Sequence, residues 1–314
     1  MGRYLTVRFG QALIVLWAAF TLSFVLLQAL PGDAILIKFQ NPDLGLSADQ
    51  IAQLRLSYGA DTAVLTQYVH AVVSLLHGDF GLSVQTGVPV SDLLSENLPS
   101  TLLLALLGLI VATILAFVLA ALSFLSPFSG LRAALQSLPS LFISVPTFWL
   151  GIVLIQIFSF QLGWIPVINP GPWQGLILPT LTLALPISAP LAQILMRSID
   201  QIQTQPFVAV ARAKGASRAG VLWRHVLGNA LLPTLTVAGL LLGELIAGAL
   251  ITETVFGRSG LGQLTQEAVN TQDSSVLQAI VVISASAFVV INLAIDLLYP
   301  LLDPRLKNST GVTS

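Results

Sequence analysis

The sequence predicts an all-α polytopic membrane protein with six transmembrane helices. Of its 314 residues, 55% are hydrophobic and only 9% are charged, whereas a soluble domain carries about 25% charged residues. So few charges cannot cover a water-facing surface, and most of the surface must therefore face lipid. The apolar segments are continuous rather than alternating, which favours membrane-spanning helices over a β-barrel. The chain has no cysteine, which excludes disulfides and thiolate metal sites.

Six segments are long and apolar enough to be spans, because a helix crosses about 30 Å of hydrocarbon in roughly 20 residues. They cover about residues 9–30, 99–123, 133–160, 175–196, 230–251 and 276–299. The first is too long for the core of a signal peptide, so we interpret it as a retained span. Asn169-Pro170-Gly171-Pro172 marks a turn between the third and the fourth. Prolines in the middle of the chain predict kinked helices, and they are Pro139, Pro146, Pro166, Pro179, Pro186 and Pro190.

The basic residues predict that both ends of the chain lie in the cytosol. In that orientation ten of the 13 lysines and arginines fall on the inner side and three on the outer side, in agreement with the positive-inside rule. The chain then divides into four parts. They are an N-terminal span in 1–30, an extracytoplasmic loop in 31–98, a core of five spans in 99–300 with a cytosolic loop at 197–229, and a cytosolic tail in 301–314.

The extracytoplasmic loop is predicted to contain two amphipathic helices. Ser47 and Gln50 have the spacing of a capping box, in which each side chain binds the backbone N–H of the other residue. Gly59 is expected to end the helix that follows. A second helix is expected at about 62–76, with an apolar face formed by Leu65, Val69, Val72 and Leu76. This loop either packs on the membrane surface and the spans or contacts an external binding protein.

The cytosolic loop is predicted to hold a short basic helix. Pro206 suits the first helical position, where its missing N–H would be unpaired anyway, and Gly215 ends the helix because glycine tolerates positive φ. Ser217 is placed to cap a second helix. One face of the first helix is shared by Phe207, Val210, Ala211 and Lys214. The helix is either a positive-inside anchor or a lever that inserts into a cleft of a partner.

Residues 209–215, followed by Asn229-Ala230-Leu231-Leu232-Pro233, resemble the cytosolic EAA loop of permease subunits of binding-protein-dependent ABC importers. The chain is most similar to the dipeptide, oligopeptide and nickel branch, and the similarity covers nearly its whole length in the same order. The other matching segments are Leu30-Pro31-Gly32-Asp33, 78–83, 98–102, 255–262, 292–299 and Asp303-Pro304-Arg305. Four positions depart from the family pattern: Ala209 stands for the motif glutamate, Gly228 for its proline, Ser259 for a proline and Gln272 for an arginine.

The resemblance implies the fold of a type I ABC importer transmembrane domain and the role of a permease subunit for short peptides or similar solutes. It implies docking of the loop helix on an ATPase, through Ala209, Ala211, Arg212, Ala213, Lys214 and Gly215. The implied partners are a second, homologous permease in a heterodimer, two ATP-binding subunits, an extracytoplasmic substrate-binding protein and the lipid of the cytoplasmic (inner) membrane. The cargo is open among dipeptides, oligopeptides, nickel complexes, glutathione and haem.

The chain is not expected to be an enzyme. A phosphate-binding P-loop needs Gly-Lys-Ser/Thr, but the three lysines are followed by Phe39, Gly215 and Asn308. ATP and Mg²⁺ are therefore expected in the partner ATPase subunits, and no cofactor, metal ion or nucleic acid is expected on this chain. His70 and His77 share a helical face but lack a third ligand, so we interpret them as surface residues.

Two acidic residues fall within the predicted spans. An ionised carboxylate in hydrocarbon costs about 2.5–3.5 kcal/mol on insertion scales, so it normally faces a cavity or a partner. Glu244 follows Gly239 and Gly243, whose spacing permits close helix packing. It is a candidate for the translocation path, or else it is hydrogen-bonded within the bundle. Asp296 is a second candidate for the path or its gating, or else it orders the end of the last span.

Two other classes of protein are alternatives to the importer subunit. A stand-alone secondary transporter or channel usually has more ionisable residues in its spans, or an inverted repeat, and no repeat is obvious in this sequence. A membrane-embedded enzyme would need a catalytic cluster, and the sequence contains neither His-Glu-x-x-His nor Gly-x-Ser-x-Gly. The importer subunit is therefore the favoured interpretation.

Overall fold

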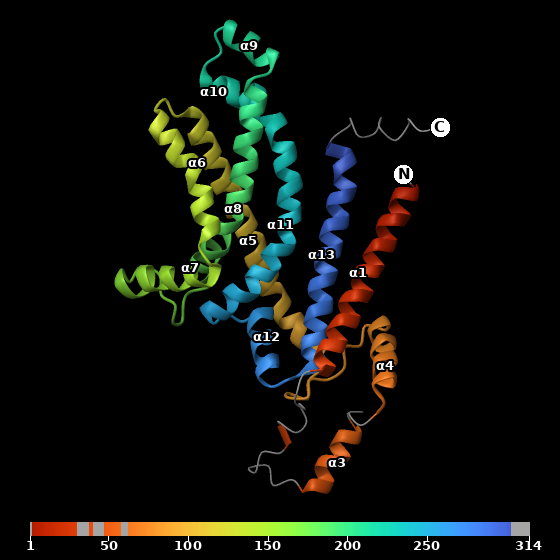
Figure 1. The fold of residues 1–314 in the computed structure, drawn as a ribbon. Coiled ribbons are helices and arrows are strands. Elements are labelled where there is room, and N and C mark those ends of the chain that lie inside the picture. Colours follow the sequence, from red (N-terminus) through yellow and green to blue (C-terminus); the bar gives the residue numbers. More distant parts are fainter. Residues whose placement is uncertain (1, 30–37, 40–46, 58–61, 303–314) are drawn as a thin grey trace. The chain divides into compact units, whose positions relative to one another are not determined.

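The computed structural model of the chain describes residues 2–29, 38–39, 47–57 and 62–302 (Figure 1). These residues are almost entirely helical, and the only β-pairing among them is an isolated bridge between Leu82 and Pro89. The predicted all-α fold class is confirmed.

Five helices contain segments long and apolar enough to cross a membrane. They are α1 (Gly2–Ala29), α5 (Val90–Leu125), α8 (Gln174–Gln203), α11 (Leu227–Phe256) and α13 (Ser274–Leu302). A sixth candidate is a bent pair, in which α6 (Ser129–Ser144) is followed by α7 (Thr147–Leu154) and the π-helix η2 (Ile155–Gln161). The count of six spans is reached only if this bent pair is one span.

The third predicted span, at 133–160, is therefore not one straight helix. The two halves of the pair are bent by 102° at a short break. Pro146 causes this break, because a proline pushes the preceding residue out of the helical region. Val145 accordingly has extended backbone angles, with φ −93° and ψ 122°. Three other prolines, Pro179, Pro186 and Pro190, lie inside α8 without ending it.

The chain forms two compact units. Unit 1 contains residues 1–101 and 257–289, and unit 2 contains residues 102–256 and 290–314. The helices α5 and α13 each contribute to both units.

In unit 2, α8 is the central helix, and it packs against α11, α6 and α7. More than half of its 30 residues are buried. Glycines on neighbouring helices allow this close packing. A Cβ atom at Gly108 of α5 or at Gly248 of α11 would lie 2.8 Å from a methyl carbon of Leu183. The side chain of Leu183 therefore fills space that any larger residue at either glycine would occupy.

In unit 1, α4 (Val64–Leu76) packs on α1 through one tyrosine. The ring of Tyr68 lies 5.8 Å from that of Phe20 and 5.3 Å from that of Phe24, measured between centroids. Its hydroxyl is 2.9 Å from the hydroxyl of Thr21. The predicted apolar face of α4 is largely exposed, since Leu65 is 74% and Leu76 80% exposed.

The predicted capping box is confirmed at the start of α3 (Ala48–Ser57). The backbone N of Ser47 donates to Gln50 Oε1 at 2.8 Å, and the backbone N of Gln50 donates to Ser47 Oγ at 3.3 Å. The predicted end of this helix at Gly59 lies outside the described residues.

Candidate functional site: the loop between α8 and α11

The connection from α8 to α11, residues 204–226, is called the α9 loop below. It begins with α9 (Pro206–Ala213), a helix of about two turns that lies at one end of α8 (Figure 1). Pro206 occupies the start of the helix, as predicted. Gly215 ends it with φ +85°, a conformation that side chains rarely adopt. Two hydrogen bonds close this end: Gly215 N donates to the carbonyl O of Arg212 at 2.9 Å, and Ala216 N to that of Ala211 at 3.1 Å.

The two faces of α9 differ in burial. Val208 and Ala211 are 0% and 8% exposed, and they anchor the helix on unit 2. Phe207 and Val210 are 45% and 53% exposed. Of the four residues predicted to share a face, only Ala211 is buried, while Lys214 is exposed like Phe207 and Val210. The helix thus presents apolar and cationic side chains outward from a small buried anchor.

The second half of the α9 loop combines two short helices. Ser217 caps α10 (Arg218–Val221) as predicted, since its Oγ accepts from the backbone N of Gly220 at 3.1 Å. A π-helix, η3 (Leu222–Val226), then leads into α11. Leu222 and Val226 are fully buried. Nothing in the sequence pattern predicts η3, because a π-helix differs from an α-helix only by one extra residue per hydrogen-bonded turn.

The structure brings the six predicted coupling residues together on α9 and its C-terminal turn. Ala211 is buried, and the other five are exposed: Ala209, Arg212, Ala213, Lys214 and Gly215. The arrangement suits a docking surface, because the charged side chains face outward while the buried residue holds the helix in place.

Of the two predicted acidic residues in spans, Glu244 has an exposed side chain on α11. The apolar part of this helix runs from Pro233 to Phe256, which places Glu244 near its middle. Leu240 and Ile251, one turn before it and two turns after it, are 58% and 51% exposed. Glu244 therefore lies within an exposed and otherwise apolar stripe. The backbone of Asp296 belongs to α13, but its side chain lies outside the described residues.

A third acidic residue of α11 and α13, Glu253, was not predicted as a candidate from the sequence. The predicted span ended at residue 251, whereas α11 continues to Phe256. Glu253 is 0% exposed, and its neighbour Thr252 is 1% exposed. The polar run Thr252-Glu253-Thr254 between apolar residues is the signal that identifies this position.

Two segments that carried the family resemblance, 98–102 and 255–262, meet within unit 1. Arg258 Nη2 donates to Ser100 Oγ at 3.3 Å, and the backbone N of Leu261 donates to Thr101 Oγ1 at 2.9 Å. The second bond provides an acceptor for the N–H of Leu261, at the start of α12 (Leu261–Asn270). The first N–H groups of a helix have no acceptor within the helix itself. Matching segments far apart in the sequence thus hold one another in place.

A second contact of this kind joins the segment before α5 to the start of α13. Ser83 Oγ donates to Asp273 Oδ2 at 2.6 Å, and both residues are buried. The backbone N of Gln85 also donates to Asp273 Oδ2, at 3.3 Å, and that of Val276 donates to Oδ1, at 3.4 Å. We call these four residues the Asp273 cluster.

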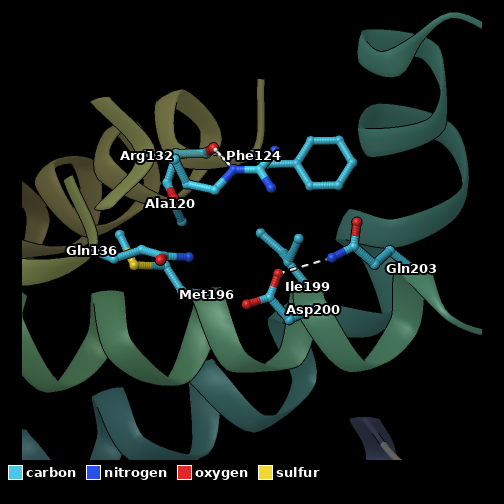
Figure 2. Close-up of a pocket in the computed structure, with 9 residues that line it drawn as sticks. Ala120, Phe124, Arg132, Gln136, Met196, Ile199, Asp200 and Gln203 are labelled. Carbon is cyan, nitrogen blue, oxygen red and sulfur yellow. Dashed lines mark hydrogen bonds between the residues drawn. The ribbon is translucent and has the colours of Figure 1, made fainter. Parts of the chain in front are cut away.

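A pocket in unit 2 opens where α5, α6 and α8 approach the α9 loop (Figure 2). Arg132 and Asp200 both line it, so charges of opposite sign face the same space. Figure 2 shows their hydrogen bonds: Arg132 Nε donates to the carbonyl O of Ser123 at 3.2 Å, and Gln203 Nε2 donates to Asp200 Oδ1 at 2.9 Å. Polar side chains of this pocket thus lie at one end of the apolar core formed by these helices. Across the described ranges, no three His, Asp or Glu side chains gather as metal ligands.

Comparison with known proteins agrees with this architecture. Residues 108–308 match the family described as "Binding-protein-dependent transport system inner membrane component". A probable peptide ABC transporter permease of Sinorhizobium fredii is 35% identical over 98% of this chain and 100% of its own length. The oligopeptide permease AppB of Bacillus subtilis and the glutathione permease GsiC of Escherichia coli K12 are each 33% identical, over 98% of this chain and 100% and 99% of theirs.

Solved structures show the same fold at lower identity. A methionine ABC transporter in an inward-facing conformation matches with a TM-score of 0.58 and 19% identity, over 67% of this chain and 96% of that one. An amino acid ABC transporter matches with a TM-score of 0.52, over 68% of this chain and 94% of that one. The fold is that of a type I ABC importer permease. The apolar spans, the α9 loop and the full-length relatives together place this chain in the family of binding-protein-dependent transport system inner membrane components.

Proposed function

We propose that this permease subunit carries short peptides, or solutes of similar size, into the cell, and that cytosolic ATPase subunits drive it by binding α9. The observation that supports this proposal best is the division of α9 into two faces. Val208 and Ala211 are buried against unit 2, while Phe207, Val210 and the two cations face outward. A helix with this division can transmit force. A partner binds its exposed face, and the buried face, which packs against unit 2, carries the movement to the spans.

The orientation in this proposal places both chain ends and the α9 loop in the cytosol, where the ATPases are. The positive-inside distribution of lysine and arginine supports it. ATP and Mg²⁺ then belong to two ATP-binding partner subunits. The remaining partners are a second permease, with which this chain forms a heterodimer, and an extracytoplasmic substrate-binding protein. Closure of the ATPase pair switches the spans between inward-facing and outward-facing states.

Glu244 is proposed to line the translocation path. Its side chain is exposed near the middle of an apolar helix, and a carboxylate facing lipid at this depth is costly. Water in a path between two permease subunits relieves that cost. Glu244→Gln is expected to lower uptake about tenfold with an unchanged complex yield, while the exposed Glu267→Gln changes neither. Unchanged uptake in the first variant removes Glu244 from the path.

The proposed peptide cargo rests on the three full-length relatives, whose names refer to peptide, oligopeptide and glutathione transport. The decisive experiment is gentle solubilisation of the chain from its native membrane, followed by identification of the proteins that co-purify. Recovery of an ATPase pair and a second permease supports the proposal and supplies the complex for uptake assays. Recovery of this chain alone, even after crosslinking, contradicts it and favours a stand-alone transporter or channel.

A further inference from the structure

The C-terminal end of α5 accepts hydrogen bonds from two arginines of different elements. The last carbonyl groups of a helix have no partner within it, and they carry partial negative charge. Arg132 of α6 donates to the carbonyl O of Ser123 at 3.2 Å, the bond drawn in Figure 2. Arg218 of α10 donates from Nη1 to the carbonyl O of Ser126 at 3.4 Å. Both serines are buried, at 3% and 8% exposed.

These two bonds differ in what they connect. Arg132 follows the end of α5 by a few residues, so its bond only closes a local turn. Arg218 is 92 positions from Ser126 in the sequence, and its bond ties the α9 loop to α5. A guanidinium at the end of a helix is favourable because its positive charge faces the negative end of the helix dipole.

An aromatic contact joins the same two elements at a second point. The rings of Trp223 in η3 and Phe117 in α5 have centroids 5.5 Å apart, at an interplanar angle of 50°. Phe117 lies about two and a half turns before Ser126, given 3.6 residues per turn. Two contacts at separate heights along a helix resist rotation as well as sliding, which one contact cannot do.

The α9 loop is attached to its other neighbours in a different way. It continues directly from α8 and leads directly into α11, so the backbone makes these two attachments. Its polar and aromatic attachment to α5 depends on the side chains of Arg218 and Trp223, helped by Val221 and Leu222 in the shared apolar core. The link to α5 is therefore the one that side-chain substitutions can weaken while leaving the loop in the chain.

We propose that Arg218 and Trp223 are positioning residues that join the α9 loop to α5, so that a displacement of α9 moves the C-terminal half of α5 with it. This inference rests on the proposed function, because it requires an ATPase that displaces α9. Without the two side chains, the ATPase still docks on α9 and still hydrolyses ATP. The movement then reaches α8 and α11 but is lost before α5, and cargo uptake falls.

The first test uses the complex of this chain with its co-purifying subunits. The double variant Arg218→Gln, Trp223→Leu is compared with Arg224→Gln, which removes an exposed cation of η3. Three quantities are measured: recovery of the ATPase, basal ATP hydrolysis, and uptake per ATP hydrolysed. We expect the first two to stay within about twofold and the third to fall about tenfold, a typical coupling between sites. Arg224→Gln is expected to behave like the unaltered chain.

A rescue and a double-mutant cycle separate positioning from simple packing. Trp223→Phe keeps an aromatic ring against Phe117 and is expected to retain most of the uptake, whereas Trp223→Leu loses it. Phe117→Leu and Trp223→Leu are expected to be non-additive in uptake per ATP, because they remove the same contact. Additive losses, or a Trp223→Phe variant as poor as Trp223→Leu, contradict a role for the ring pair.

The second test measures movement rather than activity. The chain has no native cysteine, so Leu122→Cys on α5 and Ala219→Cys on α10 accept spin labels at two exposed positions. We expect their separation to stay the same with and without ATP, and to change with ATP once Arg218→Gln and Trp223→Leu are added. A separation that changes in the unaltered background overturns the inference and leaves the proposed function intact. Failure to recover any ATPase with the unaltered chain overturns both.

Discussion

The Asp273 cluster in unit 1 and the α9 loop in unit 2 both hold segments outside the apolar spans, but by opposite means. In the cluster, a buried carboxylate accepts hydrogen bonds from Ser83, Gln85 and Val276 at 2.6–3.4 Å. In α9, the charged residues Arg212 and Lys214 are exposed, and the helix is held by two small buried side chains, Val208 and Ala211.

This difference indicates different tasks. A buried polar network with several partners fixes one geometry, because any rearrangement leaves a buried group unsatisfied. A helix held by apolar contacts and one glycine turn can be displaced as a unit without exposing polar groups. We therefore interpret the cluster as a fixed joint between the start of α5 and the start of α13, and α9 as the surface on which force is applied.

The largest expected effect is loss of the fixed joint in Asp273→Ala. Removal of the carboxylate leaves the hydroxyl of Ser83 and two backbone N–H groups without their acceptor in a buried site. We expect a loss of about 3 kcal/mol in the free energy of unfolding, since each orphaned buried group costs about 1–3 kcal/mol. Thermal unfolding of the purified chain in detergent measures this loss. Asp49→Ala, at an exposed position of α3, is the control and is expected to change little.

The next effect concerns the turn that ends α9. Gly215 has φ +85°, and a Cβ atom there would meet no other atom within 4 Å. Any loss of stability in Gly215→Val therefore comes from backbone strain alone, about 1–2 kcal/mol. We expect the strained turn to change the angle between α9 and the chain that follows it. We expect ATP hydrolysis to continue while cargo uptake falls at least tenfold.

A second glycine provides the control for this substitution. Gly228 also has open space around its Cα atom, and its φ is not in the positive range. Gly228→Val is expected to retain coupled uptake. Normal uptake in Gly215→Val contradicts the view of α9 as a rigid lever, and equal losses in both variants point to crowding of the loop by the partner.

The third effect tests the exposed charges on α9. Arg212→Gln with Lys214→Gln removes two cations from the outward face, and we expect ATPase affinity to fall about tenfold, with a weaker dependence on salt. The matched control removes the same net charge at Arg197 and Arg224, which are exposed but outside α9. Equal losses in the two double variants would assign the effect to overall charge and leave α9 only the role of an anchor.

The ends of the short helices outside the spans could be predicted from the sequence, because local residue patterns determine where such helices begin and end. Pro206, Gly215 and Ser217 marked the ends of α9 and the start of α10, and each does so in the structure. These residues act on their own backbone neighbours, so their effect can be read from a few positions. The capping box at Ser47 and Gln50 was predictable for the same reason.

The contacts that join distant segments could not be predicted in this way. Ser83 and Asp273 are 190 positions apart, and Arg218 and Ser126 are 92 positions apart. Neither pair has a spacing that predicts its meeting, because packing of the spans decides which segments approach. At Pro146 the sequence predicted a kink, but the structure has a full break with a bend of 102°, for a related reason. A proline inside an apolar run allows a kink or a break, and the neighbouring helices determine which one forms.

The smallest expected effect is that of Ser83→Ala, and it decides whether the Asp273 cluster acts as one network. Alone, this substitution removes one hydroxyl donor from Asp273 and one acceptor from the backbone N of Thr86, and we expect a loss of about 1 kcal/mol in the free energy of unfolding. Combined with Asp273→Ala, it is expected to add less than it costs alone, because the bond between Ser83 and Asp273 is already absent and only the acceptor of the backbone N of Thr86 is newly lost. Fully additive losses would show that the two side chains stabilise their segments independently, and the fixed joint would then be two separate caps.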